Sequence, residues 1–237
     1  MDAKERLIVA LDVDTQAKAL ELVEKLKNEV KFFKIGFELF SSCGPAIVES
    51  VAKKGGRVFL DLKFHDIPNT VSKAAVSVTK LGAFMFNVHA LGGYDMMKKT
   101  ADAVKLEAER LKIEKPKLLA VTVLTSMDEN ALKSVGVSDA MNAEVLRLAK
   151  LARSAGLDGV VASPSEAAMI REECGESFLI VTPGVRPSWA EAGDQKRVAT
   201  PKEAVAAGAA YIVVGRPVTE AKDPAAAARK ITEEMKT

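Results

Sequence analysis

Eight short apolar runs, rich in β-branched and aromatic residues, recur along the 237-residue chain, and longer segments with helical spacing separate them. The runs are Leu7–Leu11, Phe32–Ile35, Arg57–Leu62, Phe84–Val88, Leu118–Val123, Gly159–Ala162, Phe178–Val181 and Tyr211–Val214. Strands that alternate with helices predict a parallel sheet with right-handed crossovers. An open, doubly wound sheet needs the same alternation, but eight strands in a chain of this length favour a closed (β/α)8 TIM barrel.

Local signals support this order of elements. Three helix starts are expected where a proline follows serine or threonine, at Pro45 after Ser41-Ser42, Pro164 after Ser163 and Pro201 after Thr200. Glycines stand where four helices should end, at Gly82, Gly136, Gly156 and Gly208. No linker or low-complexity stretch divides the chain, so we expect one domain over residues 1–237, with an outer helix within Asp223–Lys236.

Composition argues against several classes of protein. The formal net charge is +2 and the basic residues form short pairs such as Lys53-Lys54, whereas a nucleic-acid-binding protein would gather them into a stripe or patch. Two cysteines are too few for a disulfide framework. Only five apolar residues follow the charged N-terminus, which is too short for a signal peptide, and no run has the length of a membrane span. We therefore expect a soluble cytoplasmic protein with no membrane or nucleic-acid partner.

Charged residues stand where the interior of a barrel should be apolar. Side chains two apart on a strand share a face, so Asp12, Lys34, Asp61 and Lys63 continue the inward faces of the first three strands at their carboxyl ends. Active sites of TIM barrels lie at that end. Burying charges costs several kcal/mol per ion before attraction offsets it. The four residues together favour a functional site, with a structural ion-pair network as the alternative.

A second group follows the last two strands. The seventh strand continues into Thr182-Pro183-Gly184-Val185-Arg186, and the eighth into Gly215-Arg216-Pro217. Barrels often bind phosphate with the loops after these two strands. Glycines there let backbone N–H groups approach an anion, and the Arg216 guanidinium could hold it with two hydrogen bonds. The pattern predicts a phosphate site.

The histidines leave two interpretations open. His65 and His89 could each act as a general base, but a histidine at a strand end more often makes a structural hydrogen bond. No grouping of His, Cys or carboxylate residues has the spacing of a metal site, and no cofactor motif is present. We expect neither a metal nor a cofactor. The polar run Trp189–Lys196 is expected to be a mobile loop.

One segment, Asp61-Leu-Lys63-Phe-His65-Asp66-Ile-Pro-Asn-Thr70, resembles the signature of the orotidine 5′-monophosphate decarboxylase family. Other stretches agree with this family in the same order, namely Ala10-Leu11-Asp12, Phe33-Lys34-Ile35-Gly36, Asn87-Val88-His89-Ala90, Val123-Leu124-Thr125-Ser126, Thr182-Pro183-Gly184-Val185-Arg186, Gly193-Asp194-Gln195-Lys196-Arg197 and Val214-Gly215-Arg216-Pro217. The resemblance covers essentially the whole chain and is to the bacterial branch of the family.

The resemblance implies a role for each matching residue. It implies that Asp12 and Lys34 bind the ribose, that Lys34, Asp61, Lys63 and Asp66 form an alternating charged array, and that Lys63 is the proton donor. It implies that Asp66 and Thr70 come from the neighbouring subunit of a homodimer with shared active sites. Thr125 would lie against the pyrimidine, a role that Ser126 could share. Arg186, Gln195, Gly215 and Arg216 would hold the phosphate, with Gln195 on a closing loop.

The implied reaction converts orotidine 5′-monophosphate to uridine 5′-monophosphate and CO2, the last step of de novo UMP synthesis. The lysine–aspartate array would stabilise the carbanion at C6 without an electron-sink cofactor. Two alternatives remain. Related magnesium-dependent sugar-phosphate decarboxylases or aldolases place a glutamate near the position of Lys34, and Glu38 is close by in the sequence. A non-catalytic phosphate-binding barrel would explain Arg216 but not the four charged residues.

Overall fold

The strands form a closed parallel barrel. A computed structural model describes residues 2–190 and 199–236. The strands are β1 (Leu7–Ala10), β2 (Phe32–Ile35), β3 (Arg57–Phe64), β4 (Met85–His89), β5 (Lys117–Val121), β6 (Gly159–Val161), β7 (Leu179–Thr182) and β8 (Tyr211–Val214). Each strand pairs with its neighbour in the chain, and β1 also pairs with β8, with Val9 opposite Val214. The predicted (β/α)8 barrel is confirmed.

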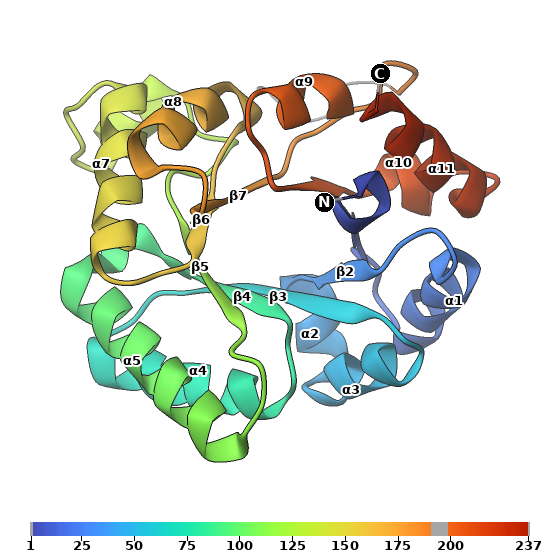
Figure 1. The fold of residues 1–237 in the computed structure, drawn as a ribbon, viewed down its shortest axis with the longest axis horizontal. Coiled ribbons are helices and arrows are strands. Elements are labelled where there is room, and N and C mark those ends of the chain that lie inside the picture. The colour runs from blue at the N-terminus through green and yellow to red at the C-terminus, as the bar shows by residue number, and fades with distance from the viewer. Residues whose placement is uncertain (1, 191–198, 237) are drawn as a thin grey trace.

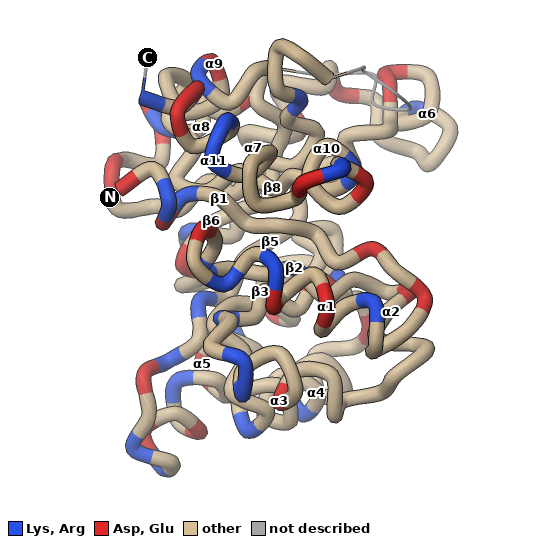
Figure 2. The backbone as a smooth tube through the Cα atoms, turned by 90° about the vertical axis from the view of Figure 1, so that its right-hand side faces the viewer, with Lys and Arg blue, Asp and Glu red and all other residues tan. Residues whose placement is uncertain are grey.

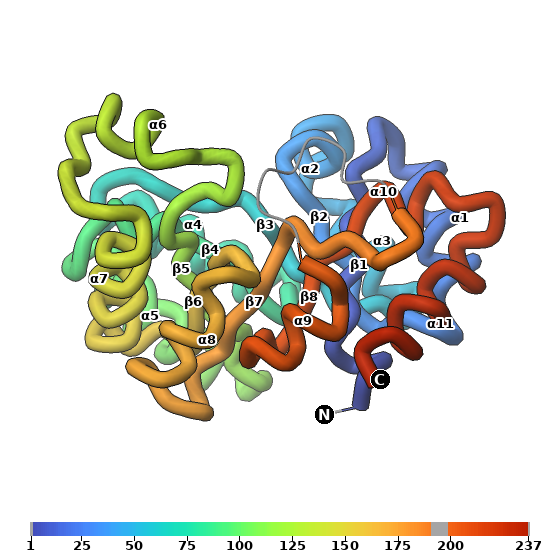
Figure 3. The backbone as a smooth tube through the Cα atoms, turned by 90° about the horizontal axis from the view of Figure 1, so that it is seen from above, coloured from blue at the N-terminus to red at the C-terminus, as the bar shows by residue number. Residues whose placement is uncertain are grey.

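Helices surround the barrel, as Figure 1 shows. They are η1 (Ala3–Glu5), α1 (Gln16–Leu26), α2 (Phe37–Cys43), α3 (Ala46–Lys53), α4 (Pro68–Lys80), η2 (Ala90–Gly92), α5 (Gly93–Leu111), α6 (Glu129–Ser134), α7 (Met141–Ser154), α8 (Pro164–Cys174), α9 (Pro201–Ala206), α10 (Arg216–Thr219) and α11 (Pro224–Glu234). In Figure 3 the two termini lie below the barrel, whereas α2 and α6 lie above it. That upper end carries the carboxyl ends of the strands.

The apolar core has two layers because strand side chains alternate between faces. The inner layer fills the barrel with Ile8, Ala10, Phe32, Phe59, Met85, Leu119, Val121, Val161, Val181, Tyr211 and Val213. The outer layer lies between strands and helices and includes Leu60 and Leu62 of β3. The inward and outward faces predicted for β3 are therefore confirmed.

Most of the predicted helix boundaries are confirmed. Ser163 and Thr200 each cap a helix that begins with proline, and each forms a capping box with the glutamate three residues later. The glycines predicted at helix ends have positive φ, for example 75° at Gly82 and 104° at Gly208. The helix start predicted at Pro45 is confirmed as well, because Pro45 is the N-cap residue of α3. Ser41 and Ser42 do not cap this helix, since they lie inside α2, a short helix that was not predicted from the sequence.

Two predicted strands, Phe32–Ile35 and Tyr211–Val214, match the structure at both ends, and the ends of the other six differ by at most two residues. The largest consequence is at β3, which continues through Lys63 to Phe64 and does not stop at Leu62. Its pairing with β4 shifts register between Leu60 and Phe64. An irregularity of this kind depends on pairing between strands, and the sequence of one strand does not reveal it.

The charged surface is mixed. Figure 2 shows Lys and Arg interspersed with Asp and Glu over the described backbone. Within residues 2–190 and 199–236, no helix is both long and apolar enough to cross a membrane.

Candidate active site

Four charged residues from three neighbouring strands meet at the carboxyl end of the barrel. Lys34 Nζ lies 2.8 Å from Asp12 Oδ1 and 3.6 Å from Asp61 Oδ2. Lys63 Nζ lies 2.7 Å from Asp61 Oδ1. The four predicted residues therefore form a continuous array of alternating charge, Asp12–Lys34–Asp61–Lys63, which begins at β1 and ends on β3.

Asp61 stands at the centre of this array and is the most buried of its carboxylates. Burial by itself would raise the Asp61 pKa, but the Lys34 and Lys63 ammonium groups outweigh burial, and the net shift lowers the pKa from its ordinary 3.8. Asp61 is therefore ionised at neutral pH. Asp61 is thus a largely buried anion that is paired with two cations, Lys34 and Lys63.

Gly36 leaves room for the first ion pair of the array. A Cβ atom at this position would lie 2.9 Å from Lys34 Nζ and 3.4 Å from Asp12 Oδ1. The first of these distances is shorter than real Cβ contacts allow, so a side chain here would displace the lysine. Gly36 contributes to the site because the absence of a side chain leaves space for the Lys34 ammonium group.

Asn87 on β4 is a further residue of this site, and no role for it was predicted from the sequence. Its Nδ2 donates to Asp61 Oδ1 at 2.7 Å, and its Oδ1 accepts from the Lys63 backbone N–H at 2.8 Å. The backbone of Lys63 has φ of 44°, in the left-handed region. The signal in the sequence was a buried amide on the inward face of a strand, two residues after the core residue Met85.

A cavity of about 150 Å³ opens beside the charged array. It is lined by Lys34, Phe59, Asp61, Lys63, Val121, Val123, Leu124, Thr125, Val161, Pro183 and Val213. Its lining combines the three charged residues Lys34, Asp61 and Lys63 with four valines and other apolar residues, among them Phe59 and Pro183. Thr125 lines the cavity, whereas Ser126 is exposed and is not among these lining residues. This placement favours Thr125 over Ser126 for contact with a bound molecule.

Two arginines gather beyond β7 and β8. Burial lowers the pKa of Arg186, and the positive charge of Arg216 lowers it further, so the two guanidinium groups lie near each other. The Arg186 backbone N–H donates to Ala199 O at 3.0 Å, so Arg186 lies beside the segment that leads into α9. At Gly215 a Cβ atom would lie 3.7 Å from Asp12 Oδ2, so the end of β8 adjoins the charged array. Gln195 lies outside the described residues.

Asp66 and Thr70 are not in the cavity of their own chain. Both are exposed, and Asp66 Oδ1 accepts a hydrogen bond from the Ile67 N–H at 2.6 Å. Thr70 lies in the first turn of α4, not in a loop. Ile67 between them is 66% exposed, which is unusual for an isoleucine.

The two histidines lie close together at the rim. The ring centroids of His65 and His89 are 5.6 Å apart. Nδ1 of His89 is buried and has no hydrogen-bond partner in the part of the chain that the structure describes. Burial lowers the His89 pKa, and the neighbouring His65 and Lys63 lower it further, so His89 is neutral at neutral pH. A neutral His89 adds no second cation beside Lys63.

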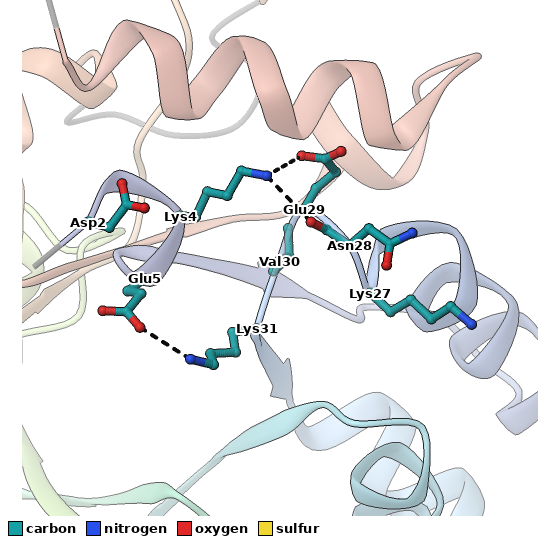
Figure 4. Close-up of a pocket in the computed structure, with 8 residues that line it drawn as sticks. All are labelled: Asp2, Lys4, Glu5, Lys27, Asn28, Glu29, Val30 and Lys31. Carbon is teal, nitrogen blue, oxygen red and sulfur yellow. Dashed lines mark hydrogen bonds and ion pairs between the residues drawn. The ribbon is translucent and has the colours of Figure 1, made fainter.

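The amino-terminal end of the barrel carries a different pocket, of about 290 Å³ (Figure 4). Its lining residues are Asp2, Lys4, Glu5, Lys27, Asn28, Glu29, Val30 and Lys31. The charges there are paired, with Lys4 Nζ 2.9 Å from Glu29 Oε2 and Lys31 Nζ 3.2 Å from Glu5 Oε1. These pairs join η1 to the segment before β2. This pocket lies at the end of the barrel opposite the charged array, away from the end at which TIM-barrel active sites are found.

The described donor atoms do not form a metal site. Within residues 2–190 and 199–236, no group of three or more His, Cys, Asp and Glu side chains could hold a metal ion. Lys34 places an ammonium group between the carboxylates of Asp12 and Asp61. Glu38 is exposed on α2 and does not line the cavity.

The sequence profile of the orotidine 5′-phosphate decarboxylase / HUMPS family matches residues 5–231. The chain belongs to this family. Orotidine 5′-phosphate decarboxylase of Syntrophotalea carbinolica is 54% identical over 235 residues, which cover 99% of this chain and 96% of that protein. The protein of the same name from Geobacter sulfurreducens is 54% identical, over 98% of this chain and 97% of that protein. The resemblance to the bacterial branch is confirmed.

Solved structures of the family agree with the fold. The crystal structure of orotidine 5′-phosphate decarboxylase from Lactobacillus acidophilus superposes with a TM-score of 0.87 at 41% identity, over 98% of this chain and all of that one. The enzyme from Pyrococcus horikoshii gives a TM-score of 0.77 at 27% identity, over 98% of this chain and 99% of that one.

Proposed function

We propose that this protein converts orotidine 5′-monophosphate to uridine 5′-monophosphate and CO2 without a metal or an organic cofactor, at the final step of UMP synthesis. One observation carries the proposal. The Lys34–Asp61–Lys63 array borders an apolar-walled cavity, with Lys63 2.7 Å from a carboxylate that its two lysine neighbours keep ionised. Family membership supplies the substrate class.

The array meets the chief difficulty of the reaction. When the bond between C6 and its carboxylate breaks, CO2 leaves and an electron pair remains at C6, where the pyrimidine ring delocalises it poorly. The Lys63 ammonium stabilises that pair by its fixed positive charge and then transfers a proton to C6. The resulting amine regains a proton from solvent. Asp61 and Lys34 hold Lys63 in place, and the apolar wall strengthens these electrostatic interactions by excluding water.

The arginines supply binding energy far from C6. Arg186, Arg216 and Gly215 would hold the phosphate, and Gln195 would join them. Asp12 lies between Gly215 and Lys34, so a ribose placed there would connect the phosphate to the ring. Contacts to remote parts of a substrate can drive ordering at the reacting centre. Enzymes lower barriers by roughly 8–23 kcal/mol, and one lysine does not account for such a value.

We further propose a two-fold homodimer in which Asp66 and Thr70 complete the partner's site. Their exposure in a single chain supports this arrangement. The connections after β3 and β4 also expose the apolar side chains of Ile67, Leu91 and Tyr94, at 66%, 45% and 42%. Exposed apolar groups beside polar ones are typical of protein–protein interfaces. In the dimer, Asp66 would extend the alternating array by one more charge.

The cytoplasm is the proposed location, since Cys43 and Cys174 are both free thiols.

The experiment that tests this function starts from protein treated exhaustively with EDTA and dialysed. We expect the absorbance of orotidine 5′-monophosphate to fall on addition of this protein, with uridine 5′-monophosphate and CO2 as products. Activity that vanishes with EDTA and returns with magnesium would support a metal-dependent sugar-phosphate enzyme instead. Binding of the nucleotide without turnover would support a phosphate-binding sensor.

A further inference from the structure

The carboxamide of Asn87 lies between the two residues on which the proposed chemistry depends. We propose that Asn87 is a positioning residue for decarboxylation, because one side chain fixes the carboxylate of Asp61 and the backbone of Lys63 relative to each other. The inference rests on the proposed function. Asn87 is fully buried, and both ends of its amide are used, with Nδ2 on Asp61 and Oδ1 on the Lys63 N–H.

The irregular pairing of β3 with β4 explains why a side chain is needed here. Leu60 pairs with Phe86, and Phe64 pairs with Val88. Four steps along β3 are thus matched by two steps along β4, so β3 carries two extra residues in a bulge. The regular ladder cannot satisfy every backbone group of such a bulge. Asn87 is the β4 residue at this gap, and its Oδ1 accepts the Lys63 N–H at 2.8 Å.

The bulge also places the Lys63 backbone in the left-handed region, with φ of 44°. This conformation is unfavourable for a residue with a Cβ atom, so contacts that hold the backbone favour it. Asn87 supplies such a contact. The direction in which the Lys63 side chain leaves β3, and therefore the position of Nζ over the cavity, depends on that held backbone.

The second end of the amide acts on Asp61. The charged and titratable groups that face Asp61 are Lys34 from β2, Lys63 from β3 and His89 from β4. Asn87 adds a neutral donor to these groups. It therefore orients the carboxylate and favours its ionised form without changing the net charge of the site. The hydrogen bond from Asn87 is one of the contributions that lower the Asp61 pKa.

The experiment compares Asn87→Ala and Asn87→Asp with the wild-type protein. Removing a hydrogen bond to a charged group should lower kcat roughly 10- to 100-fold. The Kd for uridine 5′-monophosphate should change less than about threefold, because the ground-state contacts remain. The acid limb of the kcat profile should move to higher pH in Asn87→Ala, since the Asp61 carboxylate loses a donor. It should move further in Asn87→Asp, which keeps the acceptor for Lys63 but sets a second carboxylate beside Asp61.

Val88→Ala is the matched control, because Val88 is equally buried on the same strand but faces the helices. It should lose stability while its kcat and acid limb stay as in the wild type. Hydrogen exchange at the Lys63 amide gives a readout that needs no turnover, and exchange should accelerate in Asn87→Ala and not in Asn87→Asp. If the wild-type protein were inactive, the proposed function would be contradicted, but hydrogen exchange at Lys63 would still test whether Asn87 holds its backbone.

Three results would overturn the positioning role. The first is wild-type kcat and an unmoved acid limb in a folded Asn87→Ala. The second is an equal loss of kcat in Val88→Ala, which would mean a general loosening of β4. The third is failure of both Asn87 variants to fold, which would make Asn87 a residue of the fold alone.

Discussion

Lys63 Nζ lies 2.7 Å from Asp61 Oδ1, and the two residues are separated on β3 only by Leu62. Residues two apart share a face of a strand, so both charged side chains leave β3 on its inward face. The same carboxylate also contacts Lys34, at 3.6 Å. Asp61 therefore sets the spacing of two ammonium groups whose mutual repulsion would otherwise separate them.

Arg216→Ala should weaken catalysis only for substrates that carry the phosphate. Losing a charged hydrogen-bonding group costs roughly 1.5–3 kcal/mol, so kcat/KM for orotidine 5′-monophosphate should fall about 10- to 150-fold. The slow decarboxylation of orotidine, which lacks the phosphate, should hardly change. Steady-state kinetics on both compounds make the comparison. Arg229→Ala is the control, since Arg229 pairs with Glu29 at the opposite end of the barrel. Equal losses on both substrates would give Arg216 a structural role.

Acid should destabilise the fold through His89 before it affects Asp61. The folded state holds the His89 pKa below its ordinary 6.5, so below that pH the unfolded chain binds more protons and stability falls as pH decreases. The slope from one such group is at most about 1.4 kcal/mol per pH unit. For Asp61, whose pKa is also lowered, stability is present above its ordinary 3.8 and is lost only in stronger acid.

The measurement is urea unfolding of the wild type and of His89→Gln at pH 7.5 and 5.5. The wild type should lose more stability between the two values than the variant, which cannot titrate at this position. Parallel losses in both proteins would show that burial of His89 does not resist protonation.

A shared site predicts complementation between inactive variants. Lys63→Ala and Asp66→Asn homodimers should each be nearly inactive, since every site carries one lesion. In a mixed dimer, one site collects both lesions and the other collects neither. Refolding equal amounts of the two together should restore roughly a quarter of wild-type sites. Turnover per chain after joint refolding measures this. No recovery in the presence of proven mixed dimers would place Lys63 and Asp66 in one site of one chain.

The sequence revealed the barrel and the inward-facing charges because both depend on local periodicity. Alternation along one strand was enough to place Asp61 and Lys63 on the inner face, and apolar runs located all eight strands to within two residues. The helix α2 was not predicted because a helix of seven residues is too short to show a clear helical periodicity of apolar residues in the sequence.

Side-chain contacts between neighbouring strands could not be predicted from the sequence. Asn87 matched the family in sequence, but its bonds to Asp61 and the Lys63 backbone require the register of β3 against β4. That register includes a bulge in β3, which the sequence of neither strand predicts. The sequence alone also could not predict that Asp66 and Thr70 are exposed, since a polar segment after a strand can form either a cavity wall or an outer surface. Where these two residues act depends on a second chain.

The most direct test of the central claim is turnover by Lys63→Ala under metal-free conditions. Lys53→Ala serves as the matched control, because Lys53 is an exposed lysine of α3 with its side chain 72% accessible. Circular dichroism should show both variants folded. We expect Lys63→Ala to lose at least about 10³-fold in kcat, since the fixed cation and the proton donor are removed together, while Lys53→Ala keeps wild-type activity. A folded Lys63→Ala with near-normal kcat would show that Lys63 neither stabilises the electron pair at C6 nor supplies its proton.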